Sequence, residues 1–267
     1  MNNFSKEYIL KENFSNKKNL LVLIGHLRTI EYLIKYHKKF LQKTNSDLII
    51  STWRDEHCGS NLINKIKNTL KPIYFEVEDF NFNLTVNIFG NLNKFDLVFG
   101  KSALSTRSQV YKIVKLENLI LETEKLQSKK YDIIFKSRPD LFLASEISLK
   151  LSDAEIIFES TIGDWRKDRS DRFFFAKRSR FLEFIKSLRI YGKKSWDAES
   201  MYPIYDTLPL QEQFIKYCCD KGNFITRSIL PTLRVWRPKR EPEIKDLISI
   251  NINKFLKKII NKKKISN

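Results

Sequence analysis

The order of apolar segments near the start of the chain restricts the fold more than any other feature. Residues 19–25, NLLVLIG, form a continuous apolar run that ends in a glycine, which is typical of a central strand buried on both faces. Four further segments then alternate between helical and extended patterns, at residues 30–42, 46–52, 61–70 and 73–77. This alternation predicts an open, mostly parallel α/β sheet with right-handed crossovers, flanked by helices.

The rest of the chain extends the same pattern. Residues 79–100 are only weakly periodic, which predicts an irregular loop or an insertion. The later segments predict three helices, at residues 102–126, 181–188 and 210–219. They also predict five strands, at 130–138, 154–159, 172–176, 223–229 and 233–236. Because no repeat and no flexible linker interrupts it, residues 1–246 are predicted as one domain, followed by a tail at 247–267.

Residues 130–143, KYDIIFKSRPDLFL, place charges where a strand should end. If the strand reaches Arg138, its period of two puts Lys136, Arg138 and Asp140 on one side. Pro139 cannot donate to a neighbouring strand, so pairing should stop there. Ligands of open α/β sheets bind at the carboxyl ends of the strands. These charges therefore predict a site for an anionic ligand, and the alternative is a surface ion pair.

Two other predicted strand ends carry candidate ligand contacts. Gly25 allows close approach of a ligand, and Arg28 lies where a helix begins, which together would seat a phosphate or diphosphate. The alternative is an ordinary strand-to-helix turn with a surface arginine. Trp53 ends the next strand, where it could stack on a base or sugar, or close the edge of the core.

Four more residues are candidates for the site. Arg107 and Gln109 begin the long helix, where they could contact a phosphate and a polyhydroxylated ligand. Asp171 precedes the strand RFFFA and is the first candidate for a general base, because a carboxylate can take a proton from a sugar hydroxyl. Glu212 is the second candidate, although a carboxylate at that helix start could equally stabilise the helix dipole.

The chain of 267 residues has a formal net charge of +18, which suits anionic partners such as nucleic acid, membrane surfaces or phosphorylated ligands. The tail alternates apolar residues and lysines at helical spacing, which predicts either a short helix on an anionic membrane or a frayed tail. Its lysines are Lys254, Lys257, Lys258, Lys262, Lys263 and Lys264. The three cysteines have no metal-binding spacing, and no secretory leader or membrane-spanning run is visible. We therefore expect a cytoplasmic protein, peripheral at the inner membrane.

The string KYDIIFKSRPDL, preceded by a helix carrying RSQVYKI and followed by SDRFFFAKR, resembles bacterial lipopolysaccharide and capsule glycosyltransferases of the WavE-like kind. GHLRT and STW, near the ends of the first two strands, are also similar to such enzymes, which are related to GT-A nucleotide-sugar transferases. The resemblance covers roughly residues 19–220 as an ordered series of short motifs. It implies a GT-A-like, Rossmann-like fold.

The same resemblance implies transfer of a sugar from a nucleotide-sugar donor to a surface glycan or a lipid-linked glycan. Arg138 and Asp140 match the carboxylate motif that holds Mn²⁺ or Mg²⁺ on the donor diphosphate, so Asp140 would be the metal ligand. The usual motif has two acids, and Arg138 replaces the first, so the guanidinium could itself neutralise the diphosphate. Two alternatives remain: a basic nucleic-acid-binding protein, which the buried-type strands disfavour, and a non-catalytic glycan-assembly protein with this fold. We expect no nucleic-acid partner.

Overall fold

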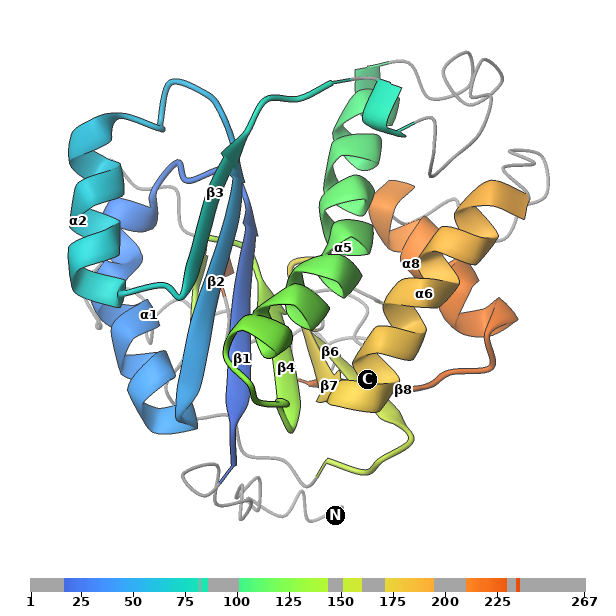
Figure 1. The fold of residues 1–267 in the computed structure, drawn as a ribbon. Helices are drawn as coiled ribbons and strands as arrows, with labels where there is room; N and C mark the ends of the chain where they lie inside the picture. The colour runs from blue at the N-terminus through green and yellow to red at the C-terminus, as the bar shows by residue number, and fades with distance from the viewer. Residues whose placement is uncertain are drawn as a thin grey trace, which may run out of the picture.

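The protein is built on a seven-stranded mixed sheet, seen nearly edge-on in Figure 1. The computed structural model describes residues 17–81, 83–85, 101–143, 151–159, 171–194, 210–229 and 234–235. The strands follow the order β3-β2-β1-β4-β7-β6-β8. They are β1 (Asn19–Gly25), β2 (Ser46–Trp53), β3 (Tyr74–Glu78), β4 (Ile133–Ser137), β6 (Glu155–Glu159), β7 (Phe173–Lys177) and β8 (Ile225–Ile229). A separate antiparallel pair joins β5 (Leu141–Phe142) to β9 (Arg234–Val235).

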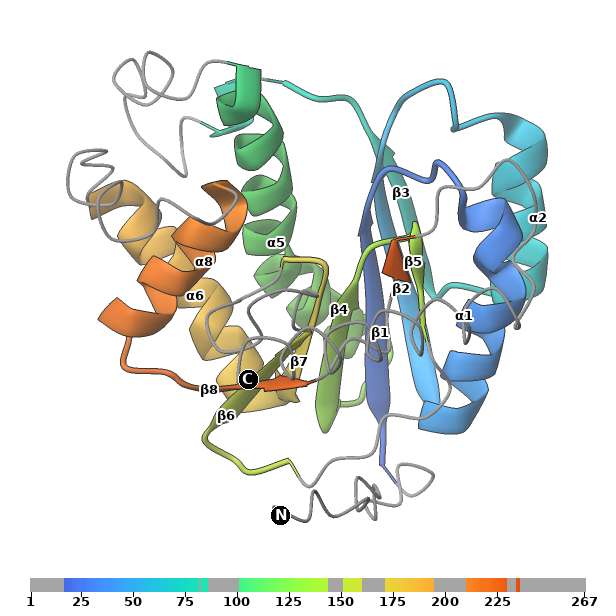
Figure 2. The ribbon, with the colours of Figure 1, turned by 180° about the vertical axis from the view of Figure 1, so that it is seen from behind.

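Helices cover both faces of the sheet, so the fold has three layers (Figures 1 and 2). One face carries α1 (Ile30–Thr44) and α2 (Ser60–Leu70). The opposite face carries α5 (Lys101–Leu126), α6 (Arg178–Lys194) and α8 (Leu210–Lys221). The predicted fold class, an open and mostly parallel sheet flanked by helices, is confirmed.

The first strand shows why its sequence is apolar without alternation. In β1, Leu20 and Val22 pack into the core under α5, α6 and α8, whereas Leu21 and Leu23 pack into the core under α1 and α2. All four side chains are fully buried. A strand covered on both faces needs an apolar residue at every position, and β1 meets that requirement.

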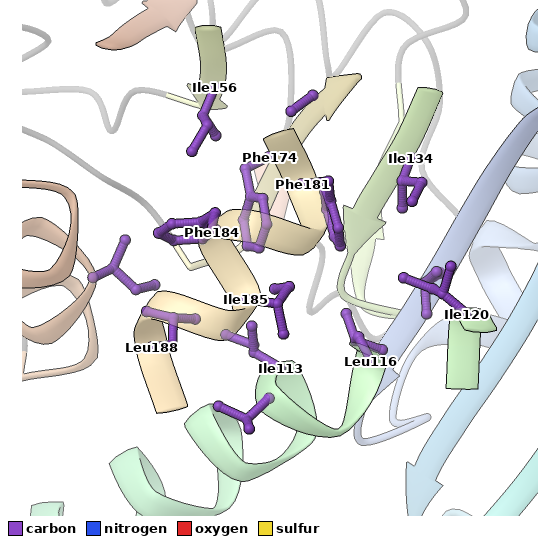
Figure 3. Close-up of a cluster of buried hydrophobic side chains, with 14 of the residues drawn as sticks. Ile113, Leu116, Ile120, Ile134, Ile156, Phe174, Phe181, Phe184, Ile185 and Leu188 are labelled. Carbon is purple, nitrogen blue, oxygen red and sulfur yellow. The ribbon is translucent and has the colours of Figure 1, made fainter. Parts of the chain in front are cut away.

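The core under α5 and α6 is the larger of the two apolar clusters (Figure 3). In it, Ile113, Leu116 and Ile120 of α5 lie on one stripe at helical spacing. Phe181 and Phe184 of α6 complete the cluster, and both rings contact Phe174 of the sheet, at centroid distances of 5.4 and 5.5 Å. This packing holds α5 and α6 against the central strands.

The connections create a switch point at the centre of the sheet. From β1 the chain builds outward through β2 to β3, all parallel, and then returns to place β4 on the other side of β1, again parallel. The two neighbours of β1 therefore lead away in opposite directions, which is where open α/β sheets form a ligand crevice. The sheet departs from a uniformly parallel arrangement because β7 runs antiparallel to both β4 and β6.

Several predicted segments fall outside the described residues. They include the C-terminal tail from residue 247, which also leaves the proposed boundary at residue 246 untested, and most of residues 79–100, where 83–85 form a helical turn. The short predicted strand at 233–236 is present as β9. Among the helices that the structure describes, none combines the length and the apolar composition that crossing a membrane requires.

Candidate functional site at the exit of β4

The central strand β4 ends as its sequence predicts. The backbone N–H of Arg138 still bonds the carbonyl of Arg172 beside it, at 3.2 Å, after which Pro139 has no N–H to donate. The chain then turns, and the N–H of Leu141 bonds the carbonyl of Arg138 at 3.2 Å. Pairing therefore stops at Pro139, and the polar residues around it lie at the carboxyl end of the strand.

Arg138 and Asp140 form a two-pronged ion pair at this exit. Nε of Arg138 donates to Oδ1 of Asp140 at 2.8 Å, and Nη2 donates to Oδ2 at 2.7 Å. The Asp140 side chain is 2% exposed, whereas that of Arg138 is 20% exposed. The pair therefore joins a buried carboxylate to a partly exposed guanidinium, a group that can recognise a phosphate.

Lys136 and Asp171 meet at the same exit because β7 is antiparallel to β4. Their register pairs Ser137 with Phe173, so the residues that precede β7 lie beside those that end β4. The buried Lys136 ammonium donates to the backbone carbonyl of Asp171. Burial lowers the pKa of Lys136 to about 8, although Asp171 and other nearby carboxylates counteract the shift. Two residues distant in sequence thus join one site.

Glu159 lies at this edge as well, and the sequence prediction missed it. It is the last residue of β6 and is fully buried, with its Oε2 atom 3.5 Å from Nε of Arg172. Burial raises the pKa of Glu159 to about 7. The signal was present in the sequence, because EIIFE is an apolar strand that closes with a carboxylate. We call the charged residues at this edge the strand-exit cluster: Lys136, Arg138, Asp140, Glu159, Asp171 and Arg172.

Pro139 also ties the exit of β4 to its surroundings. The Nε2 atom of His37, from α1, lies 3.0 Å from the Pro139 carbonyl oxygen, and burial lowers the pKa of His37 to about 4. The neutral imidazole therefore donates this bond to the carbonyl oxygen. Across the switch point, Gly25 ends β1 with a φ of +119°, and a Cβ on it would lie 3.8 Å from Cδ of Pro139. Gly25 and Pro139 thus flank the switch point.

A histidine–aspartate pair lies at the ends of β1 and β2, and the sequence prediction did not identify it. Nδ1 of His26 is 2.5 Å from Oδ2 of Asp55, whose Oδ1 accepts from the backbone N–H of His57 at 2.9 Å. Although burial opposes the change, these contacts lower the pKa of Asp55. Arg28, the predicted phosphate contact two residues further on, is exposed at a positive φ, and its role stays a prediction.

A second polar cluster joins β2 and β3 to α5, and we call it the lysine–glutamate network: Lys112, Lys115, Glu76, Glu78, Tyr111 and Ser51. The Lys112 ammonium, 1% exposed, donates to Ser51 at 2.9 Å and to Glu78 at 2.8 Å. Hydrogen bonds from lysines and hydroxyls lower the pKa of Glu76 and Glu78, although burial opposes the change. The network fastens the edge strand β3 to α5.

Trp53 packs against the lysine–glutamate network. Its ring stacks on Tyr111 at 5.7 Å, lies 4.1 Å from the Lys112 ammonium and meets the edge of Phe80 at 5.3 Å. Only 4% of the residue is exposed. The structure therefore shows Trp53 closing the edge of the core, which is the alternative that the sequence left open, and its contact with a donor stays a prediction.

The remaining predicted site residues lie on α5 and α8, the helices on the face of the sheet opposite to α1 and α2. Arg107 is fully buried in α5 and Gln109 half-buried, two residues further along. Glu212 is 5% exposed in the first turn of α8, where a carboxylate also complements the helix dipole. Their proposed contacts with a donor or an acceptor stay predictions.

The described residues do not form a ready metal site around Asp140. Both of its oxygens already accept from Arg138, and a divalent cation there would lie against the guanidinium. Within the described ranges, no group of three or more His, Cys, Asp or Glu side chains is placed to hold a metal ion. In this arrangement Asp140 pairs with Arg138, and its predicted role as a metal ligand stays a prediction.

No family model and no curated protein sequence matches the chain. Solved structures do resemble it. Mouse xyloside xylosyltransferase 1 is 12% identical over 80% of this chain and 86% of that one, with a TM-score of 0.49. The glycosyltransferase GlyE of Streptococcus pneumoniae is 8% identical over 79% and 44%, with a TM-score of 0.42. Core-mannan synthase A of Aspergillus fumigatus, in its Mn/GDP form, is 10% identical over 81% and 74%, with a TM-score of 0.39. Because each TM-score lies below 0.5, no activity transfers from these proteins.

Proposed function

We propose that the protein is a glycosyltransferase that moves a sugar from a nucleotide-sugar donor to a glycan acceptor. The observation that carries this proposal is the paired Arg138 and Asp140 at the switch point, beside the buried Lys136. A diphosphate is the leaving group of such a donor, and its developing negative charge needs fixed cations. A guanidinium held by a buried carboxylate is already oriented for that task.

The chemistry of the transfer follows from the same residues. The acceptor hydroxyl oxygen forms a bond to the anomeric carbon, the bond from that carbon to the diphosphate breaks, and its electron pair leaves with the diphosphate. Arg138 and Lys136 stabilise the departing charge. Asp171 is the proposed base that takes the hydroxyl proton, because its carboxylate lies within electrostatic range of Lys136 and Arg138 at the same strand exit. Glu212 remains the second candidate.

The acceptor is proposed from the sequence resemblance: a lipopolysaccharide, a lipooligosaccharide or a capsular glycan. Such acceptors are assembled at a membrane, and a lysine-rich tail at residues 247–267 would favour contact with anionic lipid. The domain from 1 to 246 would then carry the chemistry at the inner face of that membrane. Mn²⁺ or Mg²⁺ is a proposed cofactor of the transfer, and adding Mn²⁺ to the binding experiment tests for such an effect.

The first experiment measures thermal stability of the full chain with a panel of nucleoside diphosphates and nucleotide sugars, each with and without Mn²⁺. A ligand at about 100 times its Kd should stabilise the fold by about 2.7 kcal/mol. Arg138→Lys keeps the charge but loses the two-pronged geometry, so it should weaken diphosphate binding at least about ten-fold. Arg189→Ala is the matched control, because Arg189 pairs with Glu117 on the helical layer, at 3.0 Å.

Two results would contradict the proposal. One is the absence of stabilisation by any nucleotide, combined with tight and salt-sensitive binding of random oligonucleotides, which would favour the nucleic-acid alternative. The other is nucleotide binding without release of nucleoside diphosphate in the presence of glycan acceptors, which would favour a non-catalytic assembly protein. Equal loss of binding in Arg138→Lys and Arg189→Ala would remove Arg138 from the donor site.

A further inference from the structure

Glu159 is a buried carboxylate that the proposed chemistry does not use. It ends β6 at the carboxyl edge of the sheet, and its side chain is about 1% exposed. Neither of its two oxygens accepts a hydrogen bond from the part of the chain that the structure describes. Its nearest charged neighbour, Nε of Arg172, lies at 3.5 Å, within ion-pair distance but without a hydrogen bond. Glu159 therefore has charged neighbours and two acceptor atoms that are not used.

Such a carboxylate is costly to maintain. Removing an ionised group from water without hydrogen bonds costs several kcal/mol, and nearby cations offset only a part of that cost. Burial raises the pKa of Glu159 to about 7, and the neighbouring Asp171 adds to the increase, while Arg172 and Lys136 counteract it. Native proteins rarely leave buried acceptor atoms without hydrogen-bond donors, unless a ligand, an ion or a water supplies them. A bound ligand would supply donors to the two oxygens of Glu159.

The surroundings restrict what that ligand group can be. A phosphate is disfavoured because Glu159 and Asp171 would repel it. An added cation is also disfavoured, because Lys136, Arg138 and Arg172 already lie within electrostatic range of the carboxylate. A neutral group that donates hydrogen bonds meets neither objection. Sugar hydroxyls are such groups, and one carboxylate can accept from two neighbouring hydroxyls at once.

The position of Glu159 along the edge of the sheet matches the place where the sugar of a nucleotide sugar would lie if its diphosphate were bound at Arg138. From the switch point the edge passes β1, then β4, then β7 and then β6. Strands lie about 4.8 Å apart, so the exit of β6 is about 10 Å from that of β4. A diphosphate held at Arg138 would therefore place its attached sugar toward Glu159, on the side away from Gly25.

We propose that the Glu159 carboxylate accepts hydrogen bonds from hydroxyl groups of the donor sugar and so helps to select that sugar. This inference rests on the proposed function, because it assumes a nucleotide-sugar donor at the strand-exit cluster. Glu159 contacts the sugar and not the nucleotide. Its contribution is therefore specific to ligands that carry a sugar.

Calorimetric titration of the full chain separates the two halves of the ligand. The probes are UDP with UDP-glucose, UDP-galactose and UDP-N-acetylglucosamine, and GDP with GDP-mannose. For the nucleotide sugar that the wild type binds best, Glu159→Gln should weaken binding by about ten-fold or more, as expected for a lost charged hydrogen bond. Affinity for the matching nucleoside diphosphate should stay within about two-fold of the wild type.

A matched control lies on the same strand. Glu155 begins β6, at the opposite end from Glu159, and pairs with Arg227 at 3.0 Å. Glu155→Gln should leave both affinities unchanged. The melting temperature of ligand-free Glu159→Gln gives an independent readout: it should be equal to or above that of the wild type, because the substitution removes a buried charge without breaking a hydrogen bond.

Each contrary outcome has a distinct meaning. If the wild type binds nucleotide sugars but Glu159→Gln weakens sugar and diphosphate ligands equally, or neither, the sugar contact is wrong and the proposed function stands. A lower melting temperature in Glu159→Gln, with unchanged ligand preference, would make the residue a structural partner of Arg172. If the wild type binds none of the probes, the proposed function fails and this inference fails with it.

Discussion

Two clusters of charged side chains lie near the carboxyl ends of the strands. They differ in whether their glutamate carboxylates accept hydrogen bonds. In the lysine–glutamate network, the oxygens of Glu76 and Glu78 accept hydrogen bonds from Ser51, Tyr74, Tyr111, Lys112 and Lys115. In the strand-exit cluster, Glu159 accepts none from any of the described residues. The pKa values follow this difference, lowered for Glu76 and Glu78 and raised to about 7 for Glu159. The satisfied lysine–glutamate network fastens β3 to α5, whereas the unsatisfied Glu159 is the group for which we propose a ligand.

The largest expected effect comes from making one substitution in both clusters. Glu78→Gln removes the charge that Lys112 and Lys115 share, and it leaves the buried Lys112 ammonium poorly compensated. We expect a loss of about 3 kcal/mol in the free energy of unfolding at pH 8, measured by urea denaturation. Glu159→Gln should show no loss under the same conditions. Equal losses of unfolding free energy in Glu78→Gln and Glu159→Gln would show that the two clusters contribute to stability in the same way.

The pH dependence of stability sharpens the distinction. The raised pKa of Glu159 means that the folded protein keeps a proton which the unfolded chain releases above its ordinary value of 4.5. Glu159 therefore costs nothing below pH 4.5, and its cost grows as the pH rises to about 7, to at most about 3 kcal/mol. Denaturation of the wild type and Glu159→Gln at pH 5, 6, 7 and 8 should show a difference that widens with pH. A constant difference would contradict the raised pKa.

The smallest effect concerns the backbone beside the strand-exit cluster. Gly25→Ala places a side chain on a residue with a φ of +119°, and the nearest atom to its Cβ, Cδ of Pro139, is a tolerable 3.8 Å away. The cost is therefore backbone strain of about 1 kcal/mol, and not a clash. Gly59→Ala, at a φ of −62° with open space around it, introduces neither strain nor a clash, and its cost should be limited to the roughly 0.5 kcal/mol by which glycine is preferred over alanine at the N-cap of α2. Thermal denaturation of the two variants tests this difference.

Much of the fold could be predicted because its signals are local. The run at residues 19–25 and the helical stripe of α5 appear where expected, since apolar periodicity alone determines which faces are buried. The direction of β7 could not be predicted. Residues 173–176, FFFA, are all apolar, and a strand buried on both faces gives no indication of whether its neighbours run parallel or antiparallel.

The sequence prediction identified Lys136, Arg138 and Asp140 on one strand and Asp171 before another, but it missed Glu159. Lys136, Arg138 and Asp140 lie within five residues of one another, and their position at a strand end followed from Pro139. The place of Glu159 depends on the antiparallel β7 between β4 and β6, which no local pattern specifies. The role of Trp53 could not be decided from the sequence for the same reason, because the residues that bury its ring, Lys112 and Tyr111, lie on a helix distant in the sequence.

The pairing of β1 with β4 has a consequence for how the sheet closes. Next to this pairing, Lys18 and Asp132 are joined by a hydrogen bond across 114 positions of the sequence, whereas β1, β2 and β3 pair with near neighbours in the chain. Forming the β1–β4 pairing therefore carries the larger loop-closure entropy, and it depends on most of the chain being in place. A ligand bound across the exits of β1 and β4 adds its binding free energy at this junction and so holds together the two halves of the sheet.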